Sequence, residues 1–235
     1  MKYFITMAAV AAVACVSVFS TSVQAEDQSS IARGGLLYDK WYAVIDAPKP
    51  PETHKAWPSS NTKKKGATTW RCKSCHGWDL RGKDGAYASG SYKTGIPGVR
   101  GLEGASLDKI VAIIKDDTHG MGGMMSDADY HDLAMFISKG QVDMTKVINA
   151  DKSVNGDAAK GAAYYNTICA GCHGLDGKLP KELPKPMGKI ASGNPWETLA
   201  KIMNGQPKES MPALRALPLQ VSVDILAYTV TLPQE

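Results

Sequence analysis

The chain has 235 residues, of which 43% are hydrophobic and 21% are charged, and its formal net charge is +4. This composition is typical of a globular protein and excludes a disordered, collagen-like or multi-span membrane chain. The charge is small and mixed in sign, and aromatic residues make up only 7%, so we expect no binding to nucleic acid. The informative residues are five cysteines and five histidines.

The first segment of the chain, residues 1–25, is typical of a secretory signal peptide. Lys2 supplies a short positive region, an apolar run extends from about residue 3 to 19, and Val23-Gln24-Ala25 offers the small residues of a cleavage site. An uncleaved anchor is the alternative, because the run is close to the minimum spanning length. Lipid modification of Cys15 fits the preceding residues poorly. We expect cleavage after Ala25 and export to the periplasm.

Two Cys-x-x-Cys-His motifs dominate the rest of the chain. They are Cys72, Cys75 and His76, and Cys169, Cys172 and His173. In this spacing each thiol adds to one haem vinyl group, and the histidine binds the iron from the proximal side. Two disulfides, a four-thiolate zinc site or a dithiol redox site would each leave both histidines unexplained. The motifs predict two covalently bound haem c groups, with His76 and His173 as proximal iron ligands.

The region around the second motif, about residues 154–233, resembles class I c-type cytochromes. Gly161 and Tyr165 lie eight and four residues before Cys169, where that family packs its N-terminal helix against its C-terminal helix. Residues 223–231 resemble that C-terminal helix. The chain as a whole resembles a tandem di-haem member of the family, which implies two cytochrome c-like helical domains.

The resemblance implies Met211 as the distal ligand of the second haem. Met211-Pro212-Ala213 is similar to the family's distal-ligand loop, and Met211 follows His173 by 38 residues. Met187 comes too early in the chain, and a methionine there is more simply explained as core packing.

The distal ligand of the first haem has four candidates in one short loop. They are His119, Met121, Met124 and Met125. Phe136 follows His119 by 17 residues, as Tyr228 follows Met211 by 17, and this spacing favours His119. A register that aligns Met121-Gly122 with Met211-Pro212 favours Met121 instead. We take His119 as the first choice and keep the three methionines as alternatives.

The periodicity of the remaining sequence predicts helices rather than strands. A helix capped by Ser106 runs to about Lys115, and a capping box at 126–129 opens a helix that Gly140 ends. Asn194-Pro195 starts a helix to about residue 203. We expect a mainly α protein with a signal peptide at 1–25 and two cytochrome c domains at 26–148 and 149–235.

The first of these domains departs from the family pattern. The positions eight and four residues before Cys72 are Lys64 and Thr68, so the helix-contact pair is missing there. A helix is expected around residues 34–41, separated from the motif by an irregular insertion at 47–66. His54, within that insertion, and His131 are expected at the surface.

These features favour a periplasmic electron carrier without catalytic residues, which passes single electrons between respiratory redox proteins. Docking to a membrane or periplasmic respiratory enzyme would suit the insertion at 47–66. The alternative is a di-haem oxidoreductase with one substrate-binding haem, for example one that oxidises inorganic sulfur compounds. Thiosulfate dehydrogenases of that kind use a distal cysteine ligand, and no cysteine is left here besides Cys15 and the four attachment thiols.

Overall fold

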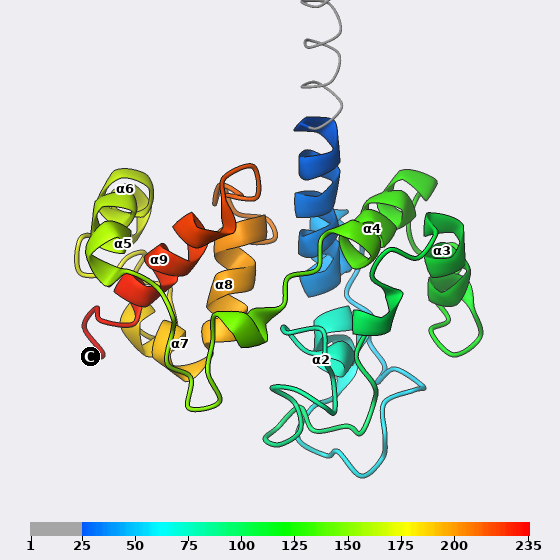
Figure 1. Ribbon diagram of the computed structural model, residues 1–235. Coiled ribbons are helices and arrows are strands. Elements are labelled where there is room, and N and C mark those ends of the chain that lie inside the picture. Colours follow the sequence, from blue (N-terminus) through cyan, green and yellow to red (C-terminus); the bar gives the residue numbers. More distant parts are fainter. Residues whose placement is uncertain (1–24) are drawn as a thin grey trace, which may run out of the picture.

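The computed structural model describes residues 25–235 (Figure 1). The predicted signal peptide covers residues 1–25, and residues 1–24 lie outside the described part of the chain. Within 25–235 the fold is helical, and the extended pairing consists of two isolated bridges with no named strand. None of the helices in this part is long and apolar enough to span a bilayer. The expected mainly α class is confirmed for these residues.

A helix spans 25–44 and is followed by a series of shorter helices. The α-helices are α2 (Cys72–His76), α3 (Leu107–Lys115), α4 (Asp127–Lys139), α5 (Ala158–Tyr164), α6 (Ala170–His173), α7 (Met187–Gly193), α8 (Pro195–Asn204) and α9 (Leu219–Thr229). Three 3-10 turns are η1 (Gly66–Trp70), η2 (Arg100–Leu102) and η3 (Met144–Lys146), and η4 (Tyr165–Cys169) is a π-helical turn.

The molecule has two hydrophobic cores, which correspond to two lobes in Figure 1. The first core is built by the 25–44 helix with α3 and α4, and the second by α5 to α9. Trp78 and Tyr87 come from the first half of the chain but pack in the second core. The two halves therefore share a packed interface in addition to the connecting segment.

Local capping signals explain where several helices begin and end. The Ser126 hydroxyl accepts from the Asp129 amide at 3.2 Å and the Asp129 carboxylate accepts from the Ser126 amide at 2.9 Å, which is the expected capping box of α4. The Asn194 side chain caps α8 by accepting a hydrogen bond from the Glu197 amide at 3.3 Å. Ser106 stands at the N-cap of α3 without a capping bond, and α9 begins at Leu219, four residues earlier than expected.

A close helix crossing organises the second half. A Cβ atom on Gly161 of α5 would overlap the Asp224 carbonyl of α9, so glycine allows the two backbones to touch. One turn later, the rings of Tyr165 and Tyr228 pack with centroids 5.3 Å apart. The Tyr165 hydroxyl donates to the Gly174 carbonyl at 3.0 Å. This confirms the helix contact that the sequence predicts for Gly161 and Tyr165.

The same contact occurs in the first half, between the 25–44 helix and α4. A Cβ atom on Gly34 would overlap the Asp132 carbonyl, and the rings of Tyr38 and Phe136 lie 5.2 Å apart. The Tyr38 hydroxyl donates to the Gly77 carbonyl at 2.7 Å. Gly77 follows the first motif as Gly174 follows the second, so the two crossings are equivalent contact by contact.

The expectation that this helix-contact pair is missing from the first half was therefore wrong. Cys169 follows Tyr165 by 4 residues, whereas Cys72 follows Tyr38 by 34. The positions eight and four residues before Cys72 are Lys64 and Thr68, which lie at the end of the insertion and just after it rather than in the helix. The insertion separates the helix from the motif in sequence, but the Tyr38 hydrogen bond brings them together in space.

Replacing Gly161 with alanine should destabilise the second half. The added methyl must push α5 away from the α9 backbone, and overpacking of this kind costs about 1–3 kcal/mol. Urea unfolding of the holoprotein measures the change. Gly193→Ala is the matched control, because a Cβ there meets nothing within 4 Å, and it should be neutral or slightly stabilising. Equal stability of the two variants would contradict the role of the crossing.

Candidate functional site

A cavity of about 440 Å³ opens in the first half of the molecule, within the range of small-molecule and cofactor sites. Its wall is mostly apolar, with Ile110 and Ile114 from α3 and Leu133 from α4. The chemically reactive side chains are Cys72, Cys75 and His76 of α2, together with His119 and Met121 from the loop after α3. The cavity thus brings one complete motif together with two of the four distal-ligand candidates.

The imidazoles of His76 and His119 face each other across this cavity. Their ring centroids lie 6.2 Å apart and the ring planes are tilted by 31°. A metal bound in line between two imidazole nitrogens, at about 2.0 Å from each, separates the ring centres by about 6 Å. This spacing would allow one metal ion to be held between His76 and His119.

Hydrogen bonds fix which nitrogen each ring presents. His76 Nδ1 lies 2.7 Å from the Pro97 carbonyl, and His119 Nδ1 lies 3.0 Å from Asp116 Oδ1. Both partners are acceptors, so Nδ1 carries the proton and the Nε2 lone pair is left available in each ring. Burial lowers the pKa of His76, opposed in part by its Pro97 contact, and this favours the neutral ring that a metal requires. The hydrogen bonds from His119 hold the pKa of Asp116 below its usual value.

The three methionine candidates lie in different surroundings. Met121 is buried and lines the cavity, and its carbonyl accepts a hydrogen bond from the Tyr130 hydroxyl. Met125 is buried in the first core, and Met124 is 36% exposed. His119 and Met121 are thus the two candidates whose side chains border the cavity.

Within residues 25–235, none of the four motif cysteines is paired in a disulfide. Burial raises the pKa of both Cys72 and Cys75 to about 12, so each is a protonated thiol at neutral pH. Among residues 25–235, no three His, Cys, Asp or Glu side chains are grouped to hold a metal. The structure therefore gives no support, in that part of the chain, to the four-thiolate zinc site considered from the sequence.

The second motif begins at Cys169, the last residue of the π-helical turn η4, and continues through α6. His173 Nδ1 lies 3.2 Å from the Leu179 carbonyl, which again leaves Nε2 available. Cys169 and Met211 are partly buried against the second core, while Cys172 is exposed. Met211 lies in the connection between α8 and α9, as the distal-ligand loop of the resemblance requires.

His54 was expected at the surface, and this was wrong. Its side chain is buried and lines the same cavity as His76 and His119. Its position inside a polar, proline-rich insertion gave no sign of burial. His131 is exposed, as expected, with 56% of its side chain accessible.

Residues 156–228 match the family model described as cytochrome C oxidase, cbb3-type, subunit III. The matched range contains the second motif and Met211. The match recognises residues 156–228 as a cytochrome c domain. Such a domain implies covalent haem c and supports a haem-based electron-transfer function. No curated protein matches the chain significantly.

The residues in both halves fit haem c. In the cytochrome c domain, two free thiols precede a histidine whose Nε2 is available. In the first half, the cavity has the required apolar wall, two thiols at its edge and two facing imidazoles. An electron carrier of the cytochrome c type also works with redox partner proteins, which the family match leaves unspecified.

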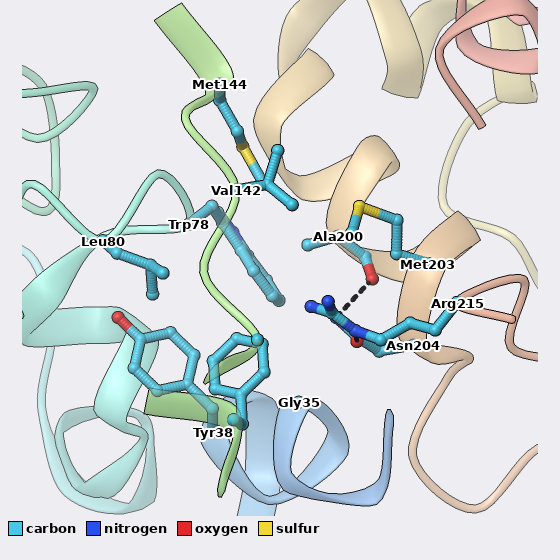
Figure 2. A pocket seen from close by; sticks show the side chains of 12 residues that line it. Gly35, Tyr38, Trp78, Leu80, Val142, Met144, Ala200, Met203, Asn204 and Arg215 are labelled. Atoms are coloured by element: carbon cyan, nitrogen blue, oxygen red, sulfur yellow. Dashed lines mark hydrogen bonds between the residues drawn. The ribbon is translucent and has the colours of Figure 1, made fainter. Parts of the chain in front are cut away.

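The cytochrome c domain meets the first half around a small cavity of about 20 Å³ (Figure 2). Trp78 points into it from the first half, opposite Asn204 and Arg215 (Figure 2). Arg215 Nε donates to Asn204 Oδ1 at 2.5 Å, and the guanidinium lies 5.4 Å from the centre of the Phe136 ring. Burial lowers the pKa of Arg215 to about 10. The contact between the Arg215 guanidinium and the Phe136 ring therefore crosses the interface between the two halves.

Lys73, inside the first motif, is a second buried cation near the interface. Its side chain is 3% exposed, and Nζ lies 4.9 Å from the Trp78 ring centre and 4.6 Å from that of Tyr92. The ring faces favour the charged form, but burial outweighs them and lowers the pKa of Lys73 to about 7. The folded state therefore binds fewer protons than the unfolded state between pH 7 and about 10.5.

Replacing Lys73 with methionine should stabilise the fold at neutral and acid pH. An apolar side chain of similar length removes the cost of burying the charge, a gain of about 1–4 kcal/mol. The gain should be largest below pH 7 and shrink as pH rises towards 10.5, because the wild-type lysine becomes neutral in both states. Urea unfolding from pH 5 to 10 measures it. A difference that does not change with pH would contradict this assignment, and Lys139→Met, at a half-exposed site, is the control.

Proposed function

We propose that this protein is an exported di-haem c-type cytochrome that passes single electrons between redox protein partners. The observation that carries the proposal is the pair formed by His76 and His119, whose rings face each other at 6.2 Å across a cavity bordered by two free thiols. The cytochrome c domain at 156–228 supplies independent support for haem-based electron transfer.

A tandem arrangement is supported by the repeated helix crossing. Gly34 and Tyr38 make the contacts in the first half that Gly161 and Tyr165 make in the cytochrome c domain. In each half the tyrosine hydroxyl reaches the carbonyl of the glycine that follows the motif histidine. We assign one haem-binding domain to residues 26–148 and a second to 149–235.

The residues divide into attachment and axial roles. Cys72 and Cys75 attach the first haem and Cys169 and Cys172 the second; the axial pairs are His76 with His119 and His173 with Met211. One-electron exchange at iron is the chemistry that haem c supplies when bound. The chain provides ligands for both axial positions of each iron, which favours a carrier over an enzyme with an open coordination position. Because a methionine ligand raises the potential, the second haem is the higher-potential one.

The sequence of residues 1–25 supports a periplasmic location, with cleavage after Ala25. The partners are a donor and an acceptor protein of the respiratory chain. Docking to a membrane or periplasmic respiratory enzyme is consistent with a carrier of this size.

Haem content combined with electron paramagnetic resonance tests the proposal. We expect two haems per chain and, in the oxidised protein, two low-spin signals, one of the bis-histidine type and one of the histidine–methionine type. A redox titration should place the histidine–methionine haem higher. One haem per chain would refute the tandem assignment, and a substantial high-spin signal would refute the carrier in favour of an iron with an open position.

A further inference from the structure

His54 occupies a defined place in the insertion between the 25–44 helix and the first motif. It is 9% exposed and contacts the loop that carries His119. Its Nε2 lies 2.8 Å from the His119 carbonyl oxygen. Its Nδ1 accepts a hydrogen bond from the Ala56 amide at 3.1 Å. Both ring nitrogens of this buried imidazole are therefore used.

These two contacts determine the tautomer of His54. Since Nδ1 accepts from a backbone N–H, it carries no proton, and the proton of the neutral ring lies on Nε2. Nε2–H then donates to the His119 carbonyl. The hydrogen bond is directional and ties the insertion to the backbone of one residue of the distal loop.

The His54 ring is itself held rigidly. Its backbone amide donates to Thr69 Oγ1 at 2.9 Å, and Thr69 Oγ1 donates to the Gly66 carbonyl at 2.7 Å. The ring lies edge-to-face on Trp70, with centroids 4.4 Å apart at 71°. The indole of Trp70 donates to the Glu52 carbonyl at 2.8 Å. Thr69 and Trp70, at the end of η1 just before the first motif, thus hold the donor in place.

The loop that His54 contacts has little stiffness of its own. Gly120 and Gly123 adopt positive φ angles of 60° and 77°, and Gly122 lies between them. Asp116 Oδ1 accepts from the His119 amide, and the Tyr130 hydroxyl anchors the loop afterwards through the Met121 carbonyl and the Met125 amide. His54 adds a contact at the His119 carbonyl, so the peptide groups on both sides of the imidazole are held.

We propose that His54 is a positioning residue that holds the His119 backbone so that the His119 imidazole faces His76 across the cavity. This inference rests on the proposed function, since it takes His119 as the distal iron ligand. The insertion then has a structural purpose, which is to bring a hydrogen-bond donor to a glycine-rich loop. Without the donor, the loop samples more conformations and His119 leaves the iron more often.

Three substitutions at His54 separate the hydrogen bond from simple packing. His54→Gln places an amide nitrogen where Nε2 stands and keeps the donor to the His119 carbonyl. His54→Asn places the amide nitrogen at the Nδ1 position and loses that donor. His54→Leu removes both polar contacts and keeps most of the volume. His131→Leu is the control, at an exposed histidine outside the cavity.

The measurement is the rate at which carbon monoxide binds the reduced holoprotein at saturating concentration, where ligand dissociation limits the rate. His119→Ala identifies the kinetic phase of the first haem, because that variant loses the dissociation step. We expect the phase to accelerate about tenfold in His54→Leu and His54→Asn, as the loss of one hydrogen bond to a carbonyl allows. The His54→Gln and His131→Leu rates should stay within about twofold of wild type.

The outcomes distinguish the assignment of His119 as the distal ligand from the positioning role of His54. If His119→Ala changes no phase and leaves the low-spin signals unchanged, His119 is not the ligand, and the axial assignment and this proposal fall together. If His119→Ala acts as expected but all His54 variants match wild type, the axial assignment stands and the positioning role of His54 is wrong. Equal acceleration in His54→Gln and His54→Leu would also overturn the proposal, because it would show a packing effect.

Discussion

Replacement of His119 by methionine is expected to raise the midpoint potential of the first haem by on the order of 0.1 V while the second haem stays unchanged. Axial ligands set haem potentials over a range of about 0.8 V, and methionine favours the reduced iron more than imidazole does. The imidazole of His119 also gains basicity from Asp116, whose carboxylate oxygen accepts a hydrogen bond from Nδ1–H with an N···O distance of 3.0 Å. Methionine lacks both the imidazole ligand and its hydrogen bond to Asp116, so both changes raise the midpoint potential.

A spectroelectrochemical titration of the holoprotein, followed by electron paramagnetic resonance, measures this result. The bis-histidine signal should be lost from the first haem, and a histidine–methionine signal should replace it. Met124→Leu is the control, because Met124 is exposed and does not line the cavity. Met121→Leu tests the rival ligand. If Met121→Leu opens the first iron while His119→Met leaves its potential unchanged, the distal ligand is Met121.

The second large effect is expected at Asp39, which joins the two halves. The Asp39 side chain is 5% exposed and pairs with Arg71, directly before the first motif, and with Lys201 of α8 at 3.1 Å. Replacing it with leucine removes the carboxylate from the partly buried Arg71 and leaves Lys201 with the longer contact to Glu197 at 3.8 Å. Removing one partner of a buried ion pair costs about 3–5 kcal/mol. We therefore expect Asp39→Leu to lower the free energy of unfolding by several kcal/mol in urea.

The matched control is Glu103→Leu. Glu103 pairs with Arg100 at 3.2 Å at the surface, where its side chain is 53% exposed, and exposed pairs contribute about 0–1 kcal/mol. A similar loss of stability in both variants would show that the Asp39 pair has no special weight.

The pH dependence gives a second measurement at Asp39. Burial raises the pKa of Asp39, but Lys201 and Arg71 outweigh it and hold the pKa below its ordinary value. The folded carboxylate is thus harder to protonate than the unfolded one. Its contribution is complete above the unfolded pKa and is lost as pH falls through the folded pKa. Asp39→Asn should therefore flatten the acid side of the stability profile, and an unchanged acid profile would contradict the ion-pair assignment.

The local elements of the fold were predictable because their signals are short-range. The capping box of α4 and the asparagine cap of α8 involve residues three apart, and both occur as the sequence indicates. The crossing at Gly161 was predictable from its fixed distance to Cys169. The equivalent crossing at Gly34 was not found by the same count, since the insertion displaces the motif. A search for Gly-x-x-x-Tyr within the 25–44 helix would have found it.

The first cavity shows a different limit of sequence reasoning. Equal spacing to the aromatic of the last helix favoured His119 over the methionines, and the structure places its ring opposite His76. Residue spacing could not predict the contacts of Asp116 and His54 with His119, because these contacts depend on the orientations of the rings and of the backbone carbonyl. Burial of His54 in a polar insertion results from long-range packing on Trp70, which periodicity does not report.

The unequal separation of helix and motif also sets the order in which the halves can fold. Cys169 follows Tyr165 by 4 residues, so the second crossing and its motif form from local contacts. Cys72 follows Tyr38 by 34 residues, and closing the longer loop costs about 2 kcal/mol more in chain entropy. Low contact order speeds folding. The chain should therefore acquire its C-terminal half first, and the N-terminal half should be the later and rate-limiting unit during maturation.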